Sequence, residues 1–156
     1  MSQRRKTMIA VIGPSQADGA LLETARLVGQ AIARQEWVLV TGGRGGVMEA
    51  ASRGADQAGG LVLGILPGTS AEEANPHVAV PIVTGLSEAR NAVLVLTADA
   101  LIAVGRGYGT LSEIGLALKL GKPLVGLDSW PIPELATAAT PDQAVAFVRQ
   151  ALAEKR

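Results

Sequence analysis

The feature that most constrains the fold is the stretch from Ala103 to Glu113, where an apolar run ends in three alternating glycines and a helical pattern begins. This order predicts a strand, a tight turn and a helix. Glycine permits a positive φ or close approach to a ligand, and a helix starting there points free N–H groups and its positive dipole end outward. The stretch therefore predicts an anion site, most often for phosphate. The alternative is an ordinary capped turn, since Thr110 and Glu113 also fit a capping box.

The same succession recurs along the chain and predicts a single α/β domain over residues 1–156. Apolar runs of strand length, typical of parallel strands covered on both faces, lie at residues 8–12, 37–41, 61–66, 78–83, 100–104 and 124–127. Helices are expected beyond Asp18, over 47–58 and 87–96, from the glycine turn to Gly121, and from an N-cap at Thr140. This alternation predicts a doubly wound, mostly parallel sheet with helices on both faces. Residues 1–7 are expected to be a flexible amino terminus.

Three glycine turns are expected at one edge of this sheet. Ligands bind beyond the carboxyl ends of the strands in such folds, and this rule brings together residues 13–15, 42–46 and 105–109. A dinucleotide fingerprint would need glycine where Thr110 and Met48 stand, and a P-loop is excluded because Pro123 follows Gly121-Lys122. The convergence favours phosphate binding without NAD binding or P-loop hydrolysis of ATP.

The residue inventory excludes several classes of chemistry. The chain has no cysteine and one histidine, His77, so disulfides, thiolate metal sites and Ser-His or Cys-His catalysis are excluded. Its 14 basic residues balance its 14 acidic residues, which disfavours a nucleic-acid partner. The apolar run at 8–12 is too short for a signal peptide, and no segment reaches the length of a membrane span. We expect a cytoplasmic protein without a metal, a resident cofactor or a membrane partner.

Four motifs in this order resemble the Lonely Guy family of cytokinin-activating phosphoribohydrolases, once labelled lysine decarboxylases, and within it the branch of molybdenum-cofactor carrier proteins. They lie at residues 13–15, 41–48, 88–91 and 105–113. The resemblance covers about residues 8–127 and implies a Rossmann-like homodimer that binds a nucleoside 5′-monophosphate. It also implies that Arg90 and Glu113 act on the N-glycosidic bond. Arg106 stands at a usual glycine and Asn91 at a usual lysine, while residues 44–49 are closer to the carrier-like branch.

The principal candidates each have two interpretations. Glu113 either stabilises an oxocarbenium-like transition state or activates water, or it only closes the capping box. Arg90 stays ionised and either holds phosphate and orients the carboxylate, or it is a solvated surface arginine. Arg106 is expected to contact phosphate or to narrow the pocket. The other candidates for ligand binding are Gly13, Ser15, Gly42, Gly43, Arg44, Gly45, Gly46, Asn91, Gly105, Gly107, Tyr108, Gly109 and Thr110.

Two functions remain open at this stage, and the presence of Arg90 and Glu113 together favours the first. One is an enzyme that hydrolyses a nucleoside monophosphate to base and ribose 5-phosphate, and the other is a carrier that binds a phosphorylated pterin or a nucleotide intact. Met48 is expected in the core and His77 in an exposed loop. The segment 86–96 carries more apolar surface than one sheet face should cover, which predicts a homodimer.

Overall fold

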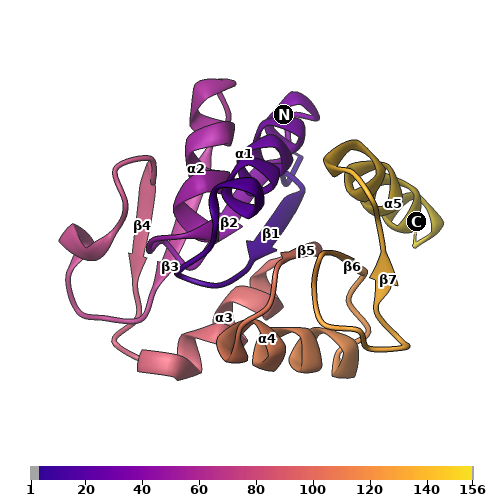
Figure 1. Cartoon of the computed structure of the whole chain (residues 1–156). Helices are drawn as coiled ribbons and strands as arrows, with labels where there is room; N and C mark the ends of the chain where they lie inside the picture. Colours follow the sequence, from indigo (N-terminus) through magenta and orange to yellow (C-terminus); the bar gives the residue numbers. More distant parts are fainter. Residues whose placement is uncertain (1–3, 156) are drawn as a thin grey trace.

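The computed structural model describes residues 4–155, in which strands and helices alternate along most of the chain (Figure 1). The strands are β1 (Met8–Ile12), β2 (Val38–Thr41), β3 (Val62–Leu66), β4 (Val80–Val83), β5 (Ala100–Val104), β6 (Leu124–Leu127) and β7 (Ala136–Thr137). The α-helices are α1 (Gly19–Arg34), α2 (Val47–Gln57), α3 (Arg90–Thr97), α4 (Tyr108–Lys119) and α5 (Pro141–Glu154). Two short 3₁₀ segments are η1 (Ala71–Glu73) and η2 (Ser87–Ala89).

The strands form one seven-stranded sheet in the order β4-β3-β2-β1-β5-β6-β7. Every pairing between neighbouring strands is parallel, and β1 lies between β2 and β5, with Ile9 opposite both Leu39 and Ala100. From β1 the chain first runs outward to β4 and then returns to β5. The strand order therefore reverses between β1 and β5, where a doubly wound sheet opens a crevice for a ligand.

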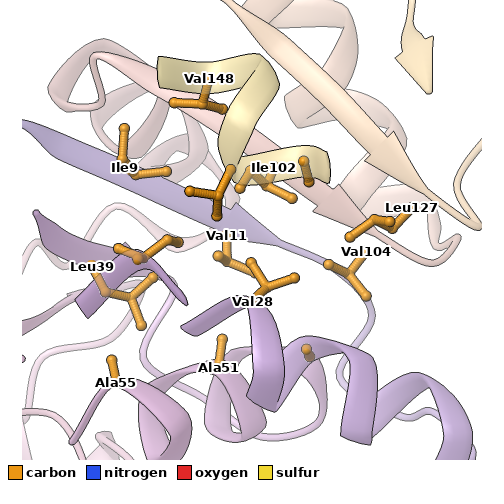
Figure 2. Close-up of a cluster of buried hydrophobic side chains, with 14 of the residues drawn as sticks. Ile9, Val11, Val28, Leu39, Ala51, Ala55, Ile102, Val104, Leu127 and Val148 are labelled. Carbon is orange, nitrogen blue, oxygen red and sulfur yellow. The ribbon is translucent and has the colours of Figure 1, made fainter. Parts of the chain in front are cut away.

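Helices cover both faces of this sheet, which confirms the predicted fold class (Figure 1). One face packs against α1, α2 and α5, and the other against α3 and α4. Along β1, Ile9 and Val11 enter the first layer, shown in Figure 2, while Ala10 and Ile12 enter the second. Because successive side chains of a strand point to opposite faces, burial of both faces requires the unbroken apolar run seen in the sequence.

Local signals correctly placed several ends of the helices. The Asp18 carboxylate caps α1 by accepting a hydrogen bond from Leu21 N at 2.8 Å. The Thr140 hydroxyl caps α5 through Gln143 N at 3.2 Å, and Gly121 has a φ of +67° just beyond α4. No helix within residues 4–155 combines the length and the apolar character needed to cross a membrane.

Other local predictions were wrong. The helix expected over 87–96 begins later, because Ser87 has a φ of +54° and begins η2, and α3 starts only at Arg90. The strand expected at 78–83 begins at Val80, and β7 was missed because two residues carry no readable periodicity. Residues 1–3 of the expected flexible amino terminus lie outside the described residues. Within the rest of that terminus, the Arg5 guanidinium pairs with Asp99 at 2.9 Å.

Candidate functional site

A cavity of about 270 Å³ lies at the carboxyl ends of β1, β2 and β5, where the strand order reverses. Its lining includes Gly13, Ser15, Gly42, Arg90, Asn91, Gly107, Tyr108, Gly109, Thr110 and Glu113 from the predicted set. It also includes Val11, Ile12, Pro14 and Met48, which the sequence did not single out for a ligand. The three glycine turns thus converge as expected, because parallel strands carry their carboxyl ends to one edge.

The amino terminus of α4 supplies hydrogen-bond donors to this cavity. Gly107 is the N-cap, with extended backbone, and Leu111 N donates to Gly107 O at 2.8 Å. The amides of Tyr108, Gly109 and Thr110 therefore precede the first hydrogen bond of the helix and are orphan donors beside its positive dipole end. This is the arrangement with which helices bind phosphate and other anions.

Thr110 lies inside α4 and not at its cap, so the capping-box interpretation is wrong. Its residue is 2% exposed, and its Oγ1 is buried without a hydrogen-bond partner among the described residues. A buried hydroxyl without a partner costs free energy unless a ligand or water supplies one. The Thr110 hydroxyl in the lining of the cavity is thus an independent indication that a polar ligand belongs there.

Glu113 lies one turn further along α4 and is 8% exposed. It does not reach back to an N-cap, so its side chain is free to face the cavity that it lines. Burial disfavours the charged form and raises the pKa of Glu113 to about 7, and the positive charge of Arg90 only partly opposes this. Such a carboxyl exchanges a proton near neutral pH, as a general acid or base must.

Arg90 is half-buried at the start of α3 and is not a solvated surface arginine. Its Nη1 donates to Gly42 O and to Ile65 O, each at 2.6 Å, and its Nε donates to Asn91 Oδ1 at 2.9 Å. Burial lowers the pKa of Arg90 from its ordinary value, Glu113 opposes that shift, and Arg44 adds to it. The guanidinium therefore ties the ends of β2 and β3 to α3 and brings positive charge to the cavity.

The turn after β2 divides into one residue that lines the cavity and four that shape the loop. Gly42 lines the cavity, and a Cβ there would meet Arg90 Nη1 at 2.7 Å. The four predicted residues at 43–46 do not line it. Gly43 and Gly46 have φ values of +77° and +65°, and Arg44 pairs with Glu73 at 3.5 Å. Glycine at positions 43 and 46 is explained by the positive φ of the turn there, which only glycine adopts without strain.

Gly105 and Arg106 also lie outside the cavity that Glu113 lines. Gly105 has a φ of +82°, and Arg106 Nε donates to Ser129 O at 3.2 Å. Both residues line a separate hollow beside the start of α1. No role in the site was predicted for Trp130 from the sequence. Its indole Nε1 donates to Gly107 O at 3.0 Å and holds the same turn. A lone tryptophan beside a proline carries no signal for such a contact.

Two residues outside the glycine turns lie in surroundings that the sequence predicted only in part. Met48 is buried, as predicted, but it also lines the cavity. His77 is partly buried rather than exposed, and its Nδ1 lies 3.1 Å from Asp56 Oδ2, away from the cavity. Within residues 4–155 no group of three or more histidine, aspartate or glutamate side chains is placed to hold a metal ion.

Comparison with known proteins gives one family and two kinds of relative. The model of the SLOG cluster4 family matches residues 6–155. The molybdenum cofactor binding protein from Rippkaea orientalis has a similar structure, with a TM-score of 0.91 and 40% identity over 96% of this chain and 99% of that one. The molybdenum cofactor carrier protein from Chlamydomonas reinhardtii gives a TM-score of 0.87 and 40% identity over the same shares.

A second kind of relative is an enzyme. The cytokinin riboside 5′-monophosphate phosphoribohydrolase of Mycobacterium tuberculosis is 33% identical over 133 residues, which are 80% of this chain and 71% of that protein. The comparisons therefore confirm the family resemblance and leave both a binding protein and a hydrolase among the relatives.

Proposed function

The chain belongs to the SLOG cluster4 family, and we propose that it binds a phosphorylated pterin, the molybdenum cofactor, and carries it intact. The pterin phosphate would lie in the cavity against the amides of Tyr108, Gly109 and Thr110. Carrying rather than hydrolysis is favoured by the structural neighbours at 40% identity over 96% of the chain, both of which are named for this cofactor. The cofactor is cargo here, and the protein's part is to hold its phosphate and shield it from water.

The observation that carries this proposal is the buried, unpartnered hydroxyl of Thr110 beside the orphan amides of α4. A phosphate oxygen accepts hydrogen bonds from both kinds of donor, and the helix dipole favours its negative charge. Arg90 adds a fixed positive charge at the same cavity. This charge and the dipole of α4 both attract an anion.

Thr110→Val tests this site, because valine keeps the shape of threonine and removes the hydroxyl. We expect inorganic phosphate to raise the unfolding temperature of the wild type, and we expect the variant to bind phosphate several-fold more weakly while its ligand-free form is equally or more stable. Mass spectrometry of protein made in cells that synthesise the cofactor should find a pterin phosphate on the wild type and less on the variant. Thr137→Val, at an exposed position in β7, is the matched control.

The proposal fails if phosphate does not stabilise the wild type and no phosphorylated compound copurifies with it. If Thr110→Val retains the pterin phosphate as well as the wild type does, the Thr110 hydroxyl is not part of the binding site. If a nucleotide copurifies in place of a pterin, the proposed phosphate site is supported and the proposed pterin ligand is wrong.

Hydrolysis of a nucleoside 5′-monophosphate is the second candidate, because Glu113 and Arg90 line the same cavity. An ionised Glu113 would stabilise the positive charge that develops on the sugar as the N-glycosidic bond breaks. Incubation with a panel of nucleoside monophosphates, followed by chromatography for free base, tests it. Release of base that Glu113→Gln abolishes while nucleotide binding persists would establish the enzyme and reject a purely carrying role.

A further inference from the structure

The cavity beside Thr110 is not the only hollow at this edge of the sheet. A second cavity, of about 780 Å³, shares Arg90, Asn91, Tyr108 and Gly109 with it. The first cavity, at about 270 Å³, lies just below the usual size of a site for a whole small ligand. The shared residues make the second cavity the adjoining space for the part of a ligand that extends beyond its phosphate.

Tyr108 lies where the two cavities adjoin, and most of its ring is in solvent. Its residue is 85% exposed, the largest exposure among the exposed large hydrophobic residues. The ring stacks on Trp130, with centroids 6.1 Å apart and planes inclined by 26°. Since only one face of a ring can lie on Trp130, the other face of Tyr108 is open to a ligand.

Trp130 is held in place from two sides, so Tyr108 stacks on a fixed ring. Its indole Nε1 donates to Gly107 O at 3.0 Å, and its ring packs against the core layer under α3 and α4. Next to it, Ser129 O accepts a hydrogen bond from Arg106 Nε at 3.2 Å. A prepositioned aromatic pair binds a planar ring at little cost in conformational entropy.

We propose that the open face of Tyr108, backed by Trp130, is an aromatic platform on which the planar heterocycle of the phosphorylated ligand stacks, so that the ring occupies the second cavity while the phosphate occupies the first. This inference rests on the proposed phosphate site. Stacking accepts any flat heterocycle, because every such ring offers a π-face. Glu88 also lines the second cavity, and its carboxylate is an acceptor for the N–H groups at the edge of an amino-substituted ring.

Guanosine 5′-monophosphate and ribose 5-phosphate are the probes that test the platform. Guanine contains the same 2-amino-4-oxopyrimidine unit as a pterin, whereas ribose 5-phosphate has the phosphate and sugar without a ring. Calorimetry should give roughly tenfold tighter binding of guanosine 5′-monophosphate by the wild type. Tyr108→Ala should remove that difference between the two probes, because it removes the ring and keeps the backbone amide that faces the phosphate, while Tyr108→Phe should retain the difference.

Fluorescence supplies a second measurement that a purely structural role would not change. In a Trp37→Phe background Trp130 is the only tryptophan, and guanosine 5′-monophosphate should quench it while ribose 5-phosphate should not. Phe147→Ala, which truncates an exposed aromatic side chain on α5, is the control for loss of aromatic surface.

The platform is overturned if the wild type binds both probes equally, or if Tyr108→Ala weakens both to the same degree. It is also overturned if Tyr108→Ala changes the oligomeric state without a ring-specific loss, because Tyr108 would then belong to a contact between copies of the chain. Failure of both probes and of inorganic phosphate to bind would instead reject the proposed phosphate site. These results separate the two proposals.

Discussion

Glu113 acquires its chemistry from its surroundings and not from its neighbours in sequence. The same side chain in an exposed first turn of a helix would be an ordinary carboxylate that helps the dipole. Here it is 8% exposed, and burial outweighs the attraction of Arg90, so its pKa rises to about 7. Its protonation therefore changes within the physiological range of pH.

This shift predicts how the stability of the protein depends on pH. The folded state binds the Glu113 proton more tightly than the unfolded state, so the stabilising contribution is complete below the ordinary pKa of 4.5 and is lost as the pH rises through about 7. Glu113→Gln has no such proton. As the pH rises from acidic to mildly alkaline, we therefore expect the unfolding free energy of Glu113→Gln to increase by about 2 to 3 kcal/mol relative to that of the wild type.

Denaturant unfolding of both proteins across that range measures the difference. The exposed Glu72→Gln makes the same chemical change outside the cavity and should follow the wild type. Parallel pH profiles for Glu113→Gln and the wild type would show that folding leaves the pKa of Glu113 at its ordinary value.

The first turn of α4 contains a glycine that lowers the stability of the helix. Gly109 lies within the helix, and a Cβ at this position would have no atom from outside its own stretch of helix within 4 Å. The same holds for Gly115 further along. Glycine inside a helix is less favourable than alanine because its backbone loses more conformational entropy on folding. Only Gly109 lines the cavity, so only there does the missing side chain have a use for binding.

Gly109→Ala and Gly115→Ala form a matched pair that separates stability from binding. Each should raise the unfolding free energy by about 0.5 to 1 kcal/mol, because alanine is the better helix former and no clash opposes it. Gly109→Ala alone should weaken phosphate binding, since its methyl group enters the cavity. Calorimetric unfolding and a phosphate titration of both variants provide the comparison, and equal phosphate affinity would mean that the ligand does not approach this backbone.

The molecule as a whole leaves apolar side chains exposed around α3. Leu94 and Val95 are buried against the sheet, whereas Leu86 is 48% exposed and Leu96 60% exposed. Neighbouring apolar residues left in solvent are typical of a surface that meets another protein. This part of the surface supports the predicted homodimer.

Light scattering at micromolar concentration should therefore give at least twice the mass of the 15.9 kDa chain. Leu96→Asp should shift that mass toward the monomer, because a charge would be buried in the contact. Leu61→Asp is the control, since Leu61 is also exposed, at 44%, but precedes β3 on a different part of the surface. A monomeric wild type would refute the prediction.

Residue patterns along the chain predicted the fold and the location of the site. Continuous apolar runs such as Met8–Ile12 are required where both faces of a strand are covered, and the glycines that follow them mark the turns at the carboxyl edge. Local rules also identified the cap at Thr140, since a cap depends only on residues within one turn.

The amino-acid sequence by itself determined the alternation of strands and helices, the convergence of the glycine turns and the presence of Arg90 and Glu113 near them. Only the tertiary structure decided what these residues contact and how deeply they are buried. It placed Thr110 inside α4 with an unpartnered hydroxyl, turned Arg106 toward Ser129, and set Trp130 beneath Tyr108. The physical reason is that burial, pKa and contact depend on atoms from segments far apart in the chain, whereas periodicity and capping depend on neighbours.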